Sequence, residues 1–295
     1  MYYEMDFKMR VPIVIVLLLY ISTLSGVTAF CYPQNLVYDK DVPRSFDIRA
    51  YETFMSFQGS AIGHCSAKCF ADLDCQAMEI CVTGGEEYCR LVRGWEPTFL
   101  GLDNGDRCQQ YKVMMNSTCG PGEFYDRGTG QCLTQEWCDF ETSPETSCFL
   151  SEDVDDIFNW SRKSGSTSSV STGPSSAKVG TYYKYIETSS PRLTGDNAKL
   201  VSNRIFEDKT YCLSLYYHMY GSTTGTLRIQ TKTGNDTSVT HWERSGDQGN
   251  SWHSLNNLTL PLDNSTQIII EGVRGSSYYS DISVDYIVLW PFSCP

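Results

Sequence analysis

The stretch from Thr210 to Gly221 constrains the fold more than any other part of the sequence. Read with a period of two, it places an apolar set of side chains on one face and a mainly aromatic set on the other. Such a strand fits the interior of a β-sandwich better than a solvated edge. The first face holds Tyr211, Leu213, Leu215, Tyr217 and Met219, and the second holds Cys212, Ser214, Tyr216, His218 and Tyr220.

The residues around this strand have the pattern of a many-stranded antiparallel sandwich. Leu227, Ile229 and Thr231 alternate with polar side chains, as in a strand with one buried face. Turn-forming residues recur between the predicted strands, and no segment of this half shows a helical period. The turn signals lie at residues 221–225, 234–236 and 245–249.

The N-terminus predicts export. Lys8 and Arg10 precede an apolar run, and small residues close the segment at Ala29, which is the pattern of a secretory signal peptide over residues 1–29. No later run has the length of a membrane span. We therefore expect a soluble, secreted mature chain without a membrane span.

Cysteines and glycosylation signals agree with that compartment. The chain has 13 cysteines, which suit an oxidising environment as disulfides. Several Asn-x-Ser/Thr sequences predict N-glycosylation at solvent-facing positions. They are at Asn116, Asn159, Asn235, Asn257 and Asn264.

The charge of the chain excludes several classes of partner. The net charge is -12 and the pI is about 4.8, so the surface is unsuited to contacting the phosphate backbone of nucleic acid. Anionic lipid and heparin-like polyanions are disfavoured for the same reason.

Residues 30–118 hold a compact cysteine cluster. Cys65 and Cys69 are four residues apart, which puts both sulfurs on one face of a short helix, and residues 76–82 and 88–92 alternate like strands packed on it. Zinc is the alternative to disulfides, but no Cys-x-x-Cys pair or suitably spaced His accompanies the cluster. The pattern predicts a small disulfide-rich α+β domain.

This cluster resembles the PAN/apple family. The resemblance rests on six cysteines in the family's order, namely Cys31, Cys65, Cys69, Cys75, Cys89 and Cys108. It implies bonds between Cys31 and Cys108, Cys65 and Cys89, and Cys69 and Cys75. Cys81 has no family partner, so it could pair outside the domain, remain a buried thiol, or link two chains in a disulfide-linked or self-associating oligomer.

Residues 119–137 are rich in turn-forming residues and predict a connector between two domains. A bond between Cys119 and Cys132 would close this connector. Such a clip would stiffen the joint, whereas a bare Gly/Ser linker would leave it flexible.

From Cys138 onward the ordered blocks of the sequence resemble a MAM domain, the extracellular module of meprins, neuropilins and receptor tyrosine phosphatases. The blocks are 138–141, Cys148, 155–160, 182–187, 210–221, 267–275, 281–287 and Cys294. The resemblance implies a jelly-roll-like antiparallel β-sandwich over residues 138–295. It also implies disulfides between Cys138 and Cys148 and between Cys212 and Cys294.

One segment departs from that family, because residues 162–178 are rich in Ser, Thr and Gly. We interpret this segment as a solvated loop between strands. The alternative is a contact surface at the end of the sandwich, where loops commonly carry recognition.

The sequence carries no catalytic motif that we recognise. Its histidines form no His-Glu-x-x-His helix, and no Gly-x-Ser-x-Gly or Walker loop occurs, so we expect a protein that is not an enzyme. A structural calcium ion is a separate expectation, because calcium prefers oxygen ligands gathered from several segments. By the family resemblance, the candidate ligands are Asp139, Glu141, Asp156, Asp281 and Asp285.

The sequence thus predicts a secreted adhesion or interaction protein that binds extracellular or cell-surface proteins through both modules. In one alternative, the PAN-like half binds glycans by stacking Trp95, Phe99 and Tyr111 on sugar rings. In the other, the chain is a structural component of the extracellular matrix.

Overall fold

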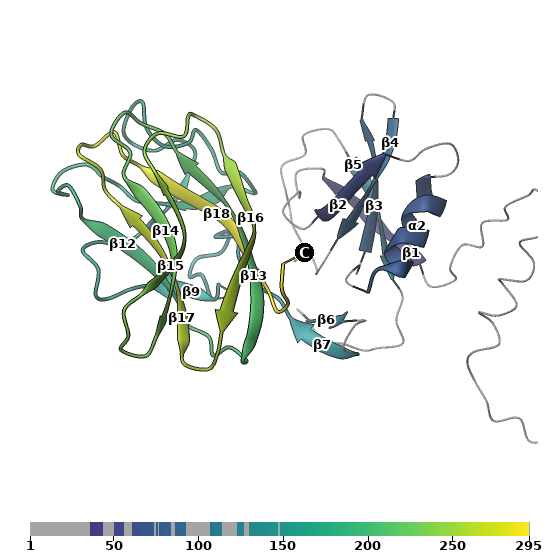
Figure 1. The fold of residues 1–295 in the computed structure, drawn as a ribbon. Coiled ribbons are helices and arrows are strands. Elements are labelled where there is room, and N and C mark those ends of the chain that lie inside the picture. The colour runs from purple at the N-terminus through teal and green to yellow at the C-terminus, as the bar shows by residue number, and fades with distance from the viewer. Residues whose placement is uncertain are drawn as a thin grey trace, which may run out of the picture.

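The computed structural model describes residues 36–43, 50–55, 61–73, 75, 77–83, 86–92, 107–113, 123–126, 130–146 and 148–294. Within these residues the chain forms a small sheet with one helix, a two-stranded hairpin and a large β-sandwich (Figure 1). Several predicted features lie outside the described residues, namely the signal peptide, Cys31, Trp95, Phe99, Asn116 and Cys119.

The first domain is a five-stranded antiparallel sheet in the order β1-β5-β3-β4-β2, with helix α2 (Ala61–Ala71) packed on β3 and β4. Cys65 and Cys69 on α2 are fully buried, as their spacing on one helix face predicts. The strands are β1 (Leu36–Pro43), β2 (Ala50–Met55), β3 (Ala77–Thr83), β4 (Glu86–Val92) and β5 (Arg107–Val113).

The disulfides of this domain correct one expectation. Cys65 bonds Cys89 and Cys69 bonds Cys75, but Cys81 bonds Cys108. The expected bond between Cys31 and Cys108 is therefore wrong. The reason is the strand register, which places Cys81 of β3 directly opposite Cys108 of β5 with their Cα atoms 4.2 Å apart. Cys81 is consequently not available to link two chains.

The connector contains regular structure as well as turns. Strands β6 (Glu123–Asp126) and β7 (Gln131–Thr134) form a hairpin, and β8 (Glu136–Cys138) pairs with residues 287–289 of the sandwich. Cys132 on β7 is disulfide-bonded, and its partner lies outside the described residues. The chain thus enters the second domain as a strand of that domain's own sheet.

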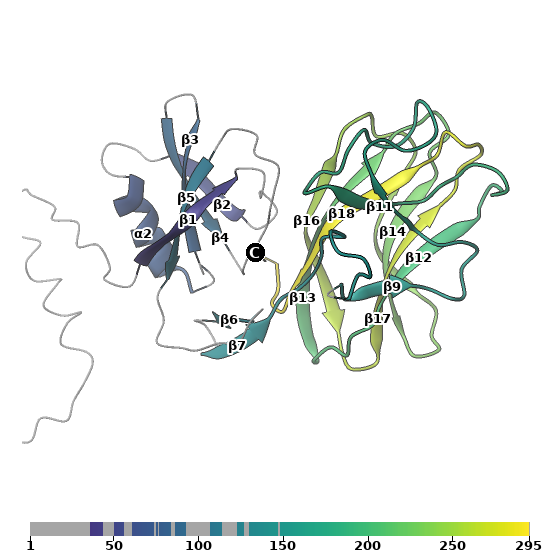
Figure 2. The ribbon, with the colours of Figure 1, turned by 180° about the vertical axis from the view of Figure 1, so that it is seen from behind.

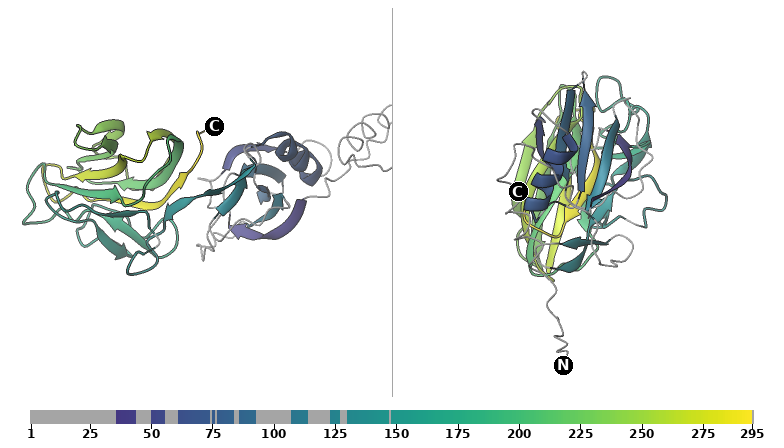
Figure 3. Two further views of the ribbon diagram at one scale, coloured as in Figure 1. Left: turned by 90° about the horizontal axis from the view of Figure 1, so that it is seen from below. Right: turned by 90° about the vertical axis from the view of Figure 1, so that its right-hand side faces the viewer.

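The second domain is a sandwich of two antiparallel sheets (Figures 2 and 3). The first, which we call the β13 sheet, has the order β10-β11-β18-β13-β16, with β8 beside β18. The second, the β17 sheet, has the order β15-β14-β17-β12-β9. No helix occurs among the described residues from 138 to 294, as the absence of a helical period predicts.

The strands of the sandwich have the following bounds. The β13 sheet contains β10 (Ser161–Ser164), β11 (Tyr182–Tyr185), β13 (Lys209–Met219), β16 (His253–Leu262) and β18 (Ile282–Trp290). The β17 sheet contains β9 (Leu150–Glu152), β12 (Asn197–Ser202), β14 (Thr226–Thr233), β15 (Val239–Ser245) and β17 (Thr266–Val273).

Strand β13 lies inside its sheet between β18 and β16, which confirms the prediction from its two apolar faces. The face with Leu213 and Leu215 belongs to the main core between the sheets. The face with Cys212 and Tyr216 belongs to a second apolar cluster on the outer side of the sheet. This outer cluster means that something other than the β17 sheet must cover the β13 sheet.

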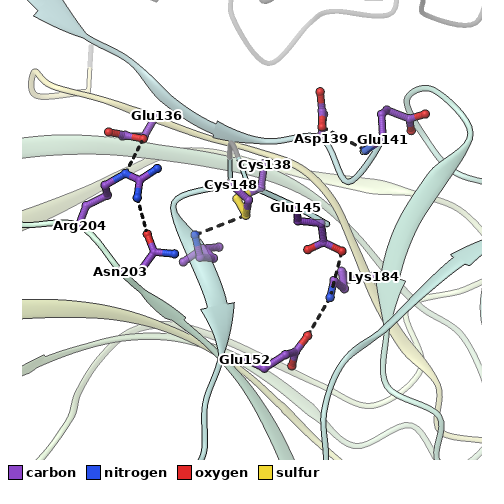
Figure 4. The surroundings of a disulfide bond; sticks show 11 residues. Glu136, Cys138, Asp139, Glu141, Glu145, Cys148, Glu152, Lys184, Asn203 and Arg204 are labelled. Carbon is purple, nitrogen blue, oxygen red and sulfur yellow. Dashed lines mark hydrogen bonds and ion pairs between the residues drawn. A yellow bond between two sulfur atoms is a disulfide. The ribbon is translucent and has the colours of Figure 1, made fainter. Parts of the chain in front are cut away.

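Two disulfides lie near the end of the sandwich where β18 ends. Cys138 bonds Cys148 near the entry of the chain, and Cys212 on β13 bonds Cys294 at the end of the described residues. Around the first bond, the Lys184 Nζ lies 3.2 Å from a Glu145 carboxylate oxygen and 2.8 Å from one of Glu152 (Figure 4). Charged side chains therefore link β11 to β9, across the two sheets.

The two disulfides should differ in their effect on stability. Cys212–Cys294 spans 82 residues and Cys138–Cys148 spans 10, so the chain-entropy model gives about 4.5 and about 2.7 kcal/mol of stabilisation, respectively. We expect the double variant Cys212→Ala/Cys294→Ala to unfold at a lower temperature and to be secreted less than Cys138→Ala/Cys148→Ala. Calorimetry of both purified variants checks this order, and equal melting temperatures would contradict it.

Candidate functional site

Four loops meet at the end of the sandwich where β18 begins, which is the end away from the pairing of β8. Hydrogen bonds join these loops: the Ser169 and Ser189 hydroxyl oxygens are 3.1 Å apart, and the Thr223 amide donates to the Tyr279 carbonyl at 3.2 Å. The four loops are residues 165–175, 187–196, 220–225 and 274–281, which we call the loop face.

The Ser/Thr/Gly-rich segment has the exposed side chains expected of a loop, among them Ser166, Ser168 and Ser175, but it also has a buried side that its composition did not indicate. Thr167, Thr172, Ala177 and Val179 are buried, and Val179 belongs to the apolar cluster on the outer side of the β13 sheet. The threonine hydroxyls tolerate burial because each donates to a carbonyl, Thr167 to Thr172 at 2.9 Å and Thr172 to Tyr220 at 2.8 Å. The segment therefore packs over the sheet.

Asp285 on β18 fixes the second half of this segment. Its Oδ2 accepts hydrogen bonds from the backbone amides of Lys178 and Val179 at 2.8 and 2.9 Å. Its Oδ1 is buried and has no hydrogen-bond partner among the described residues. Asp285 Oδ2 thus holds the loop, whereas Oδ1 is buried without a hydrogen-bond donor among the described residues.

Asp281 fixes the first half of the segment and a neighbouring loop. Its Oδ1 accepts hydrogen bonds from the amide and the hydroxyl of Thr188 at 3.2 and 2.9 Å. Its own amide donates to the Thr172 hydroxyl at 2.9 Å. Asp281 therefore joins three of the four loops of the loop face, while its Oδ2 is buried without a described partner.

Glu141 holds the place where the segment enters β11. Its Oε1 accepts hydrogen bonds from the amides of Thr181 and Tyr182 at 2.9 and 2.8 Å. Gly180 lies at a φ of +68°, and a Cβ there would collide with the Glu141 carboxylate. Glu141 and Asp285 thus bind the chain on either side of Gly180.

The five carboxylates that the sequence proposed for calcium do not form one cluster. Asp139 accepts the Glu141 amide at 3.1 Å, beside the Cys138–Cys148 disulfide (Figure 4), and Asp156 accepts the amide of Lys199 on the other sheet at 2.6 Å. Among the described residues, no three of the five bring one oxygen each within 4.8 Å of one another. Of the five, Glu141 and Asp285 are the two whose carboxylates bind the same segment, residues 178–182.

One group of potential metal ligands is found elsewhere in the described residues, and its atoms are already in use. It consists of Glu79, Cys81 and Cys108. The two sulfurs are joined in a disulfide, and Glu79 Oε2 lies 2.8 Å from the Arg90 guanidinium in a buried ion pair. The structure therefore gives zinc no thiolate there.

Exposed apolar side chains are present on the loop face. Val170 is 74% exposed, Leu193 69% and Tyr278 42%. The Tyr278 ring lies 4.1 Å from that of Tyr279, and the two hydroxyls are hydrogen-bonded at 2.6 Å. These side chains come from three different loops and give this end a partly apolar surface.

The charged side chains of the loop face are held by their own neighbours. The Arg274 Nε donates to the Thr188 carbonyl at 2.7 Å, and the Arg192 guanidinium lies over the Phe158 ring at 4.4 Å. Asp196 accepts the Leu193 amide at 2.7 Å. These charges stabilise the loops themselves, so they contribute less to recognition than free charges would.

Three of the four described glycosylation signals lie away from the loop face. Asn235 and Asn264 lie in the turns at the opposite end of the sandwich, and Asn257 lies on strand β16. Asn159 lies just before β10, outside the four loops. All four side chains are exposed, which fits glycosylation at these positions. Glycans at Asn235, Asn257 and Asn264 would leave the loop face uncovered, whereas Asn159 lies beside it, because the neighbouring Phe158 ring packs against Arg192 of the loop 187–196.

The histidines of the sandwich have structural neighbours. His218 is buried on β13, its Nε2 is 3.2 Å from Asn250 Oδ1, and burial lowers its pKa to about 4. His253 stacks on Tyr217 with ring centroids 5.4 Å apart. His218 is therefore neutral at pH 7 and packs as part of the fold.

Burial changes the ionisation of the two aspartates that hold the loops. It raises the pKa of Asp281 from 3.8 to about 6, although hydrogen bonds from Thr188 lower it and Glu187 raises it further. Burial also raises the pKa of Asp285 well above 3.8, against the lowering effect of the Val179 and Lys178 amides. Both groups would be more stable with a proton or a cation beside the unpaired oxygen.

Sequence reasoning missed the role of the 165–181 segment. The signal was present in Ala177 and Val179, two apolar residues that follow the Ser-rich run, and in the spacing of Asp281 and Asp285 on one face of a strand.

Of the aromatic residues proposed for sugar binding, Tyr111 is described, and its hydroxyl donates to Gln109 at 3.1 Å. Among the described residues, no helix is long and apolar enough to cross a membrane.

Comparison with known proteins agrees with the fold. Residues 138–295 match the family model described as "MAM domain, meprin/A5/mu". MAM domain-containing glycosylphosphatidylinositol anchor protein 1 of Gallus gallus is 40% identical over 174 residues, which cover 55% of this chain and 18% of that protein. MAM domain-containing protein 2 of Homo sapiens is 34% identical over 197 residues, covering 59% of this chain and 27% of that protein.

The chain therefore spans about a fifth of the length of the first of these relatives. Among solved structures, the K1 cleaved adhesin domain of Lys-gingipain from Porphyromonas gingivalis W83 is 14% identical, with a TM-score of 0.38. The similar region covers 53% of this chain and 97% of that domain.

The raised pKa of buried Asp281 predicts that the stability of the protein depends on pH. Because the folded pKa of Asp281 is about 6 and its ordinary value is 3.8, the native state binds this proton more tightly than the unfolded state does. Its contribution to stability is full below about pH 4 and is lost as the pH rises through 6. We expect the melting temperature to rise on acidification from pH 7.5 to 5, and Asp281→Asn to reduce that rise. An identical pH dependence in the variant would contradict this.

Proposed function

Residues 138–295 make this chain a member of the MAM domain family, and we propose that it is a non-enzymatic extracellular adhesion protein that binds other proteins through its loop face. The observation that carries the proposal is the loop face itself. Val170, Leu193 and Tyr278 project there from loops whose hydrogen bonds to Asp281 and to one another hold them in place. Pre-ordered loops lose little entropy on binding, which favours recognition.

The composition of the loop face supports a protein partner. Its loops are made mainly of Ser, Thr, Gly and Tyr, the residue types that antibody loops use to combine adaptable hydrogen bonds with rigid contact area. In a chain with a net charge of -12, this end has few charged side chains, and Arg192, Asp196 and Arg274 are held by contacts with their own neighbours. We therefore expect binding that depends little on salt concentration.

Three observations support an extracellular location. Disulfides join residues in both domains, and the described glycosylation signals are exposed. The name of the Gallus gallus relative describes a glycosylphosphatidylinositol anchor protein. Secretion after removal of residues 1–29 is our proposal from the sequence, and it differs from anchoring in that the protein would be recovered in the medium without phospholipase treatment.

We also propose that the first domain is a PAN/apple-like interaction module. Its support is a single helix packed on an antiparallel sheet, with Cys65 and Cys69 of that helix bonded to Cys89 and Cys75. The Cys81–Cys108 bond departs from the pairing that the family resemblance implies. This domain would provide a second contact surface for protein partners.

A structural calcium ion at Glu141 and Asp285 is a further part of the proposal. Calcium needs oxygen ligands from different segments, and these two residues come from opposite ends of the domain. The unpaired Oδ1 of Asp285 is the specific observation that favours an ion, because a buried carboxylate oxygen without a donor is unfavourable. Both carboxylates bind the same short segment, since Asp285 accepts the Val179 amide and Glu141 accepts the Thr181 amide.

The loop face can be tested by substitution. We expect Val170→Ser/Leu193→Ser to weaken binding of the labelled protein to receptor-bearing cells by about tenfold or more, since buried apolar contacts dominate such interfaces. The control is Ile205→Ser, which removes an 85% exposed apolar side chain between β12 and β13 at the other end of the sandwich. Flow cytometry measures all three proteins. Equal loss in both variants, or no loss in the first, would reject the loop face.

A second test, also read by flow cytometry of cell binding, adds a glycan to the loop face instead of removing apolar side chains. Val170→Asn creates the sequence Asn-Ser-Thr at residues 170–172 and so introduces a glycan on the loop face. We expect this variant to be secreted and folded but unable to bind cells.

The calcium proposal is tested by melting. Calcium added after chelation should raise the melting temperature of the wild-type protein, because a ligand at a hundredfold its Kd contributes about 2.7 kcal/mol. Asp285→Asn and Glu141→Gln should lose most of that response. Asp156→Asn should keep it, because Asp156 binds the Lys199 amide on the other sheet. A wild-type melting curve that does not change with calcium would remove the ion from the account.

A further inference from the structure

Two long strands of the sandwich have one unpaired edge. Among the described residues, β15 pairs with β14 alone and β16 pairs with β13 alone. These edge strands have 7 and 10 residues, whereas the edge strands at the opposite side, β9 and β10, have 3 and 4. The open hydrogen-bonding groups of the sandwich are thus concentrated at β15 and β16.

A long open edge is a hazard for a secreted β-protein. Its free amide and carbonyl groups can pair with the same edge of a second copy, and natural proteins usually block such edges. Strand β16 has some protection from Pro261 and from the irregular pairing at residues 256–257. Strand β15 begins with Val239, which is 57% exposed and offers no charge.

The glycosylation signals gather at these two strands. Asn257 is exposed on β16 itself, Asn235 lies in the turn that leads into β15, and Asn264 lies in the turn that follows β16. The two turns are joined, because the Gly234 amide donates to the Ser265 carbonyl at 3.2 Å. Three of the four described signals therefore lie on or next to the open edges.

We propose that N-glycans at Asn235, Asn257 and Asn264 cover the open edges of β15 and β16 and prevent a second copy of the chain from pairing with them. A glycan is bulky and hydrated, so it excludes another strand from the edge without altering the strand's own backbone. The glycan at Asn257 has the largest effect, since it rises from the middle of the longer edge strand. This role is independent of the loop face, which lies at the other end.

Asn257 also has a structural reason to be present. Its φ is +63°, a conformation that asparagine adopts more readily than most residues. A substitution of Asn257 would therefore change the backbone as well as the glycan. Thr259 offers a cleaner change, because it is exposed and forms the third position of the same signal.

The test compares variants of the full chain produced in glycosylating cells. Thr259→Val abolishes the signal but keeps a β-branched side chain, and Thr259→Ser keeps the signal. Ser161→Ala removes the signal at Asn159, near the short edge strands, and is the matched control for glycan loss. Mass spectrometry of glycopeptides gives the occupancy of each position, and light scattering after size exclusion gives the mass in solution.

We expect Thr259→Val to associate, with a roughly twofold or larger increase in solution mass, while Thr259→Ser and Ser161→Ala behave as the wild type. If Thr259→Val does not fold, the folded wild type treated with a peptide N-glycosidase takes its place. The proposal is overturned if Asn257 carries no glycan, if the deglycosylated edge leaves the mass unchanged, or if Ser161→Ala associates equally.

Discussion

The arrangement of the second domain depends on two buried aspartates, Asp281 immediately before β18 and Asp285 on β18. Asp281 and Asp285 both have 0% of their surface exposed, and a buried carboxylate is tolerated when donors surround it. Backbone amides of Lys178, Val179 and Thr188 provide those donors. The polar loops therefore fold over the outer side of the β13 sheet, where otherwise an aromatic face would meet water. The loop face is a consequence of this burial.

The sequence predicted the parts of the fold that follow from side-chain periodicity. Strand β13 has two faces suited to burial, and the structure places it between two neighbours with a core on each side. Strand β14 alternates buried Leu227 and Ile229 with polar residues, as expected for one solvated face. In both strands the pattern is local, so the residues themselves contain the information.

The errors concern contacts that depend on distant residues. Composition indicated a solvated loop at 162–178, because Ser, Thr and Gly cannot form a core alone. However, the Lys178 amide donates to the Asp285 carboxylate, and the Thr172 hydroxyl accepts from the Asp281 amide, in each case more than a hundred residues away. The partner of Cys108 followed from the register of β3 and β5, which no spacing reveals. The calcium ligands proposed from the family included Asp156, which binds the other sheet.

The two ends of the sandwich have different surfaces, and we assign them different roles. One end presents ordered, largely uncharged loops with exposed apolar side chains. The other end and the adjoining edge strands carry Asn235, Asn257 and Asn264. In a protein of net charge -12, the first is the surface on which contact meets the least repulsion, and the second is the one that glycans would keep apart from other chains.

Hydrogen exchange at single-residue resolution tests the central claim most directly, because it reports whether the aspartates hold the loops. The account predicts that the amides of Lys178, Val179, Thr181 and Tyr182 exchange as slowly as those of neighbouring strands in the native protein. It also predicts that Asp285→Asn speeds exchange at Lys178 and Val179 more than at Thr181 and Tyr182, which bind Glu141. Exchange of the Lys178 and Val179 amides at the rate of an unfolded peptide would contradict the account.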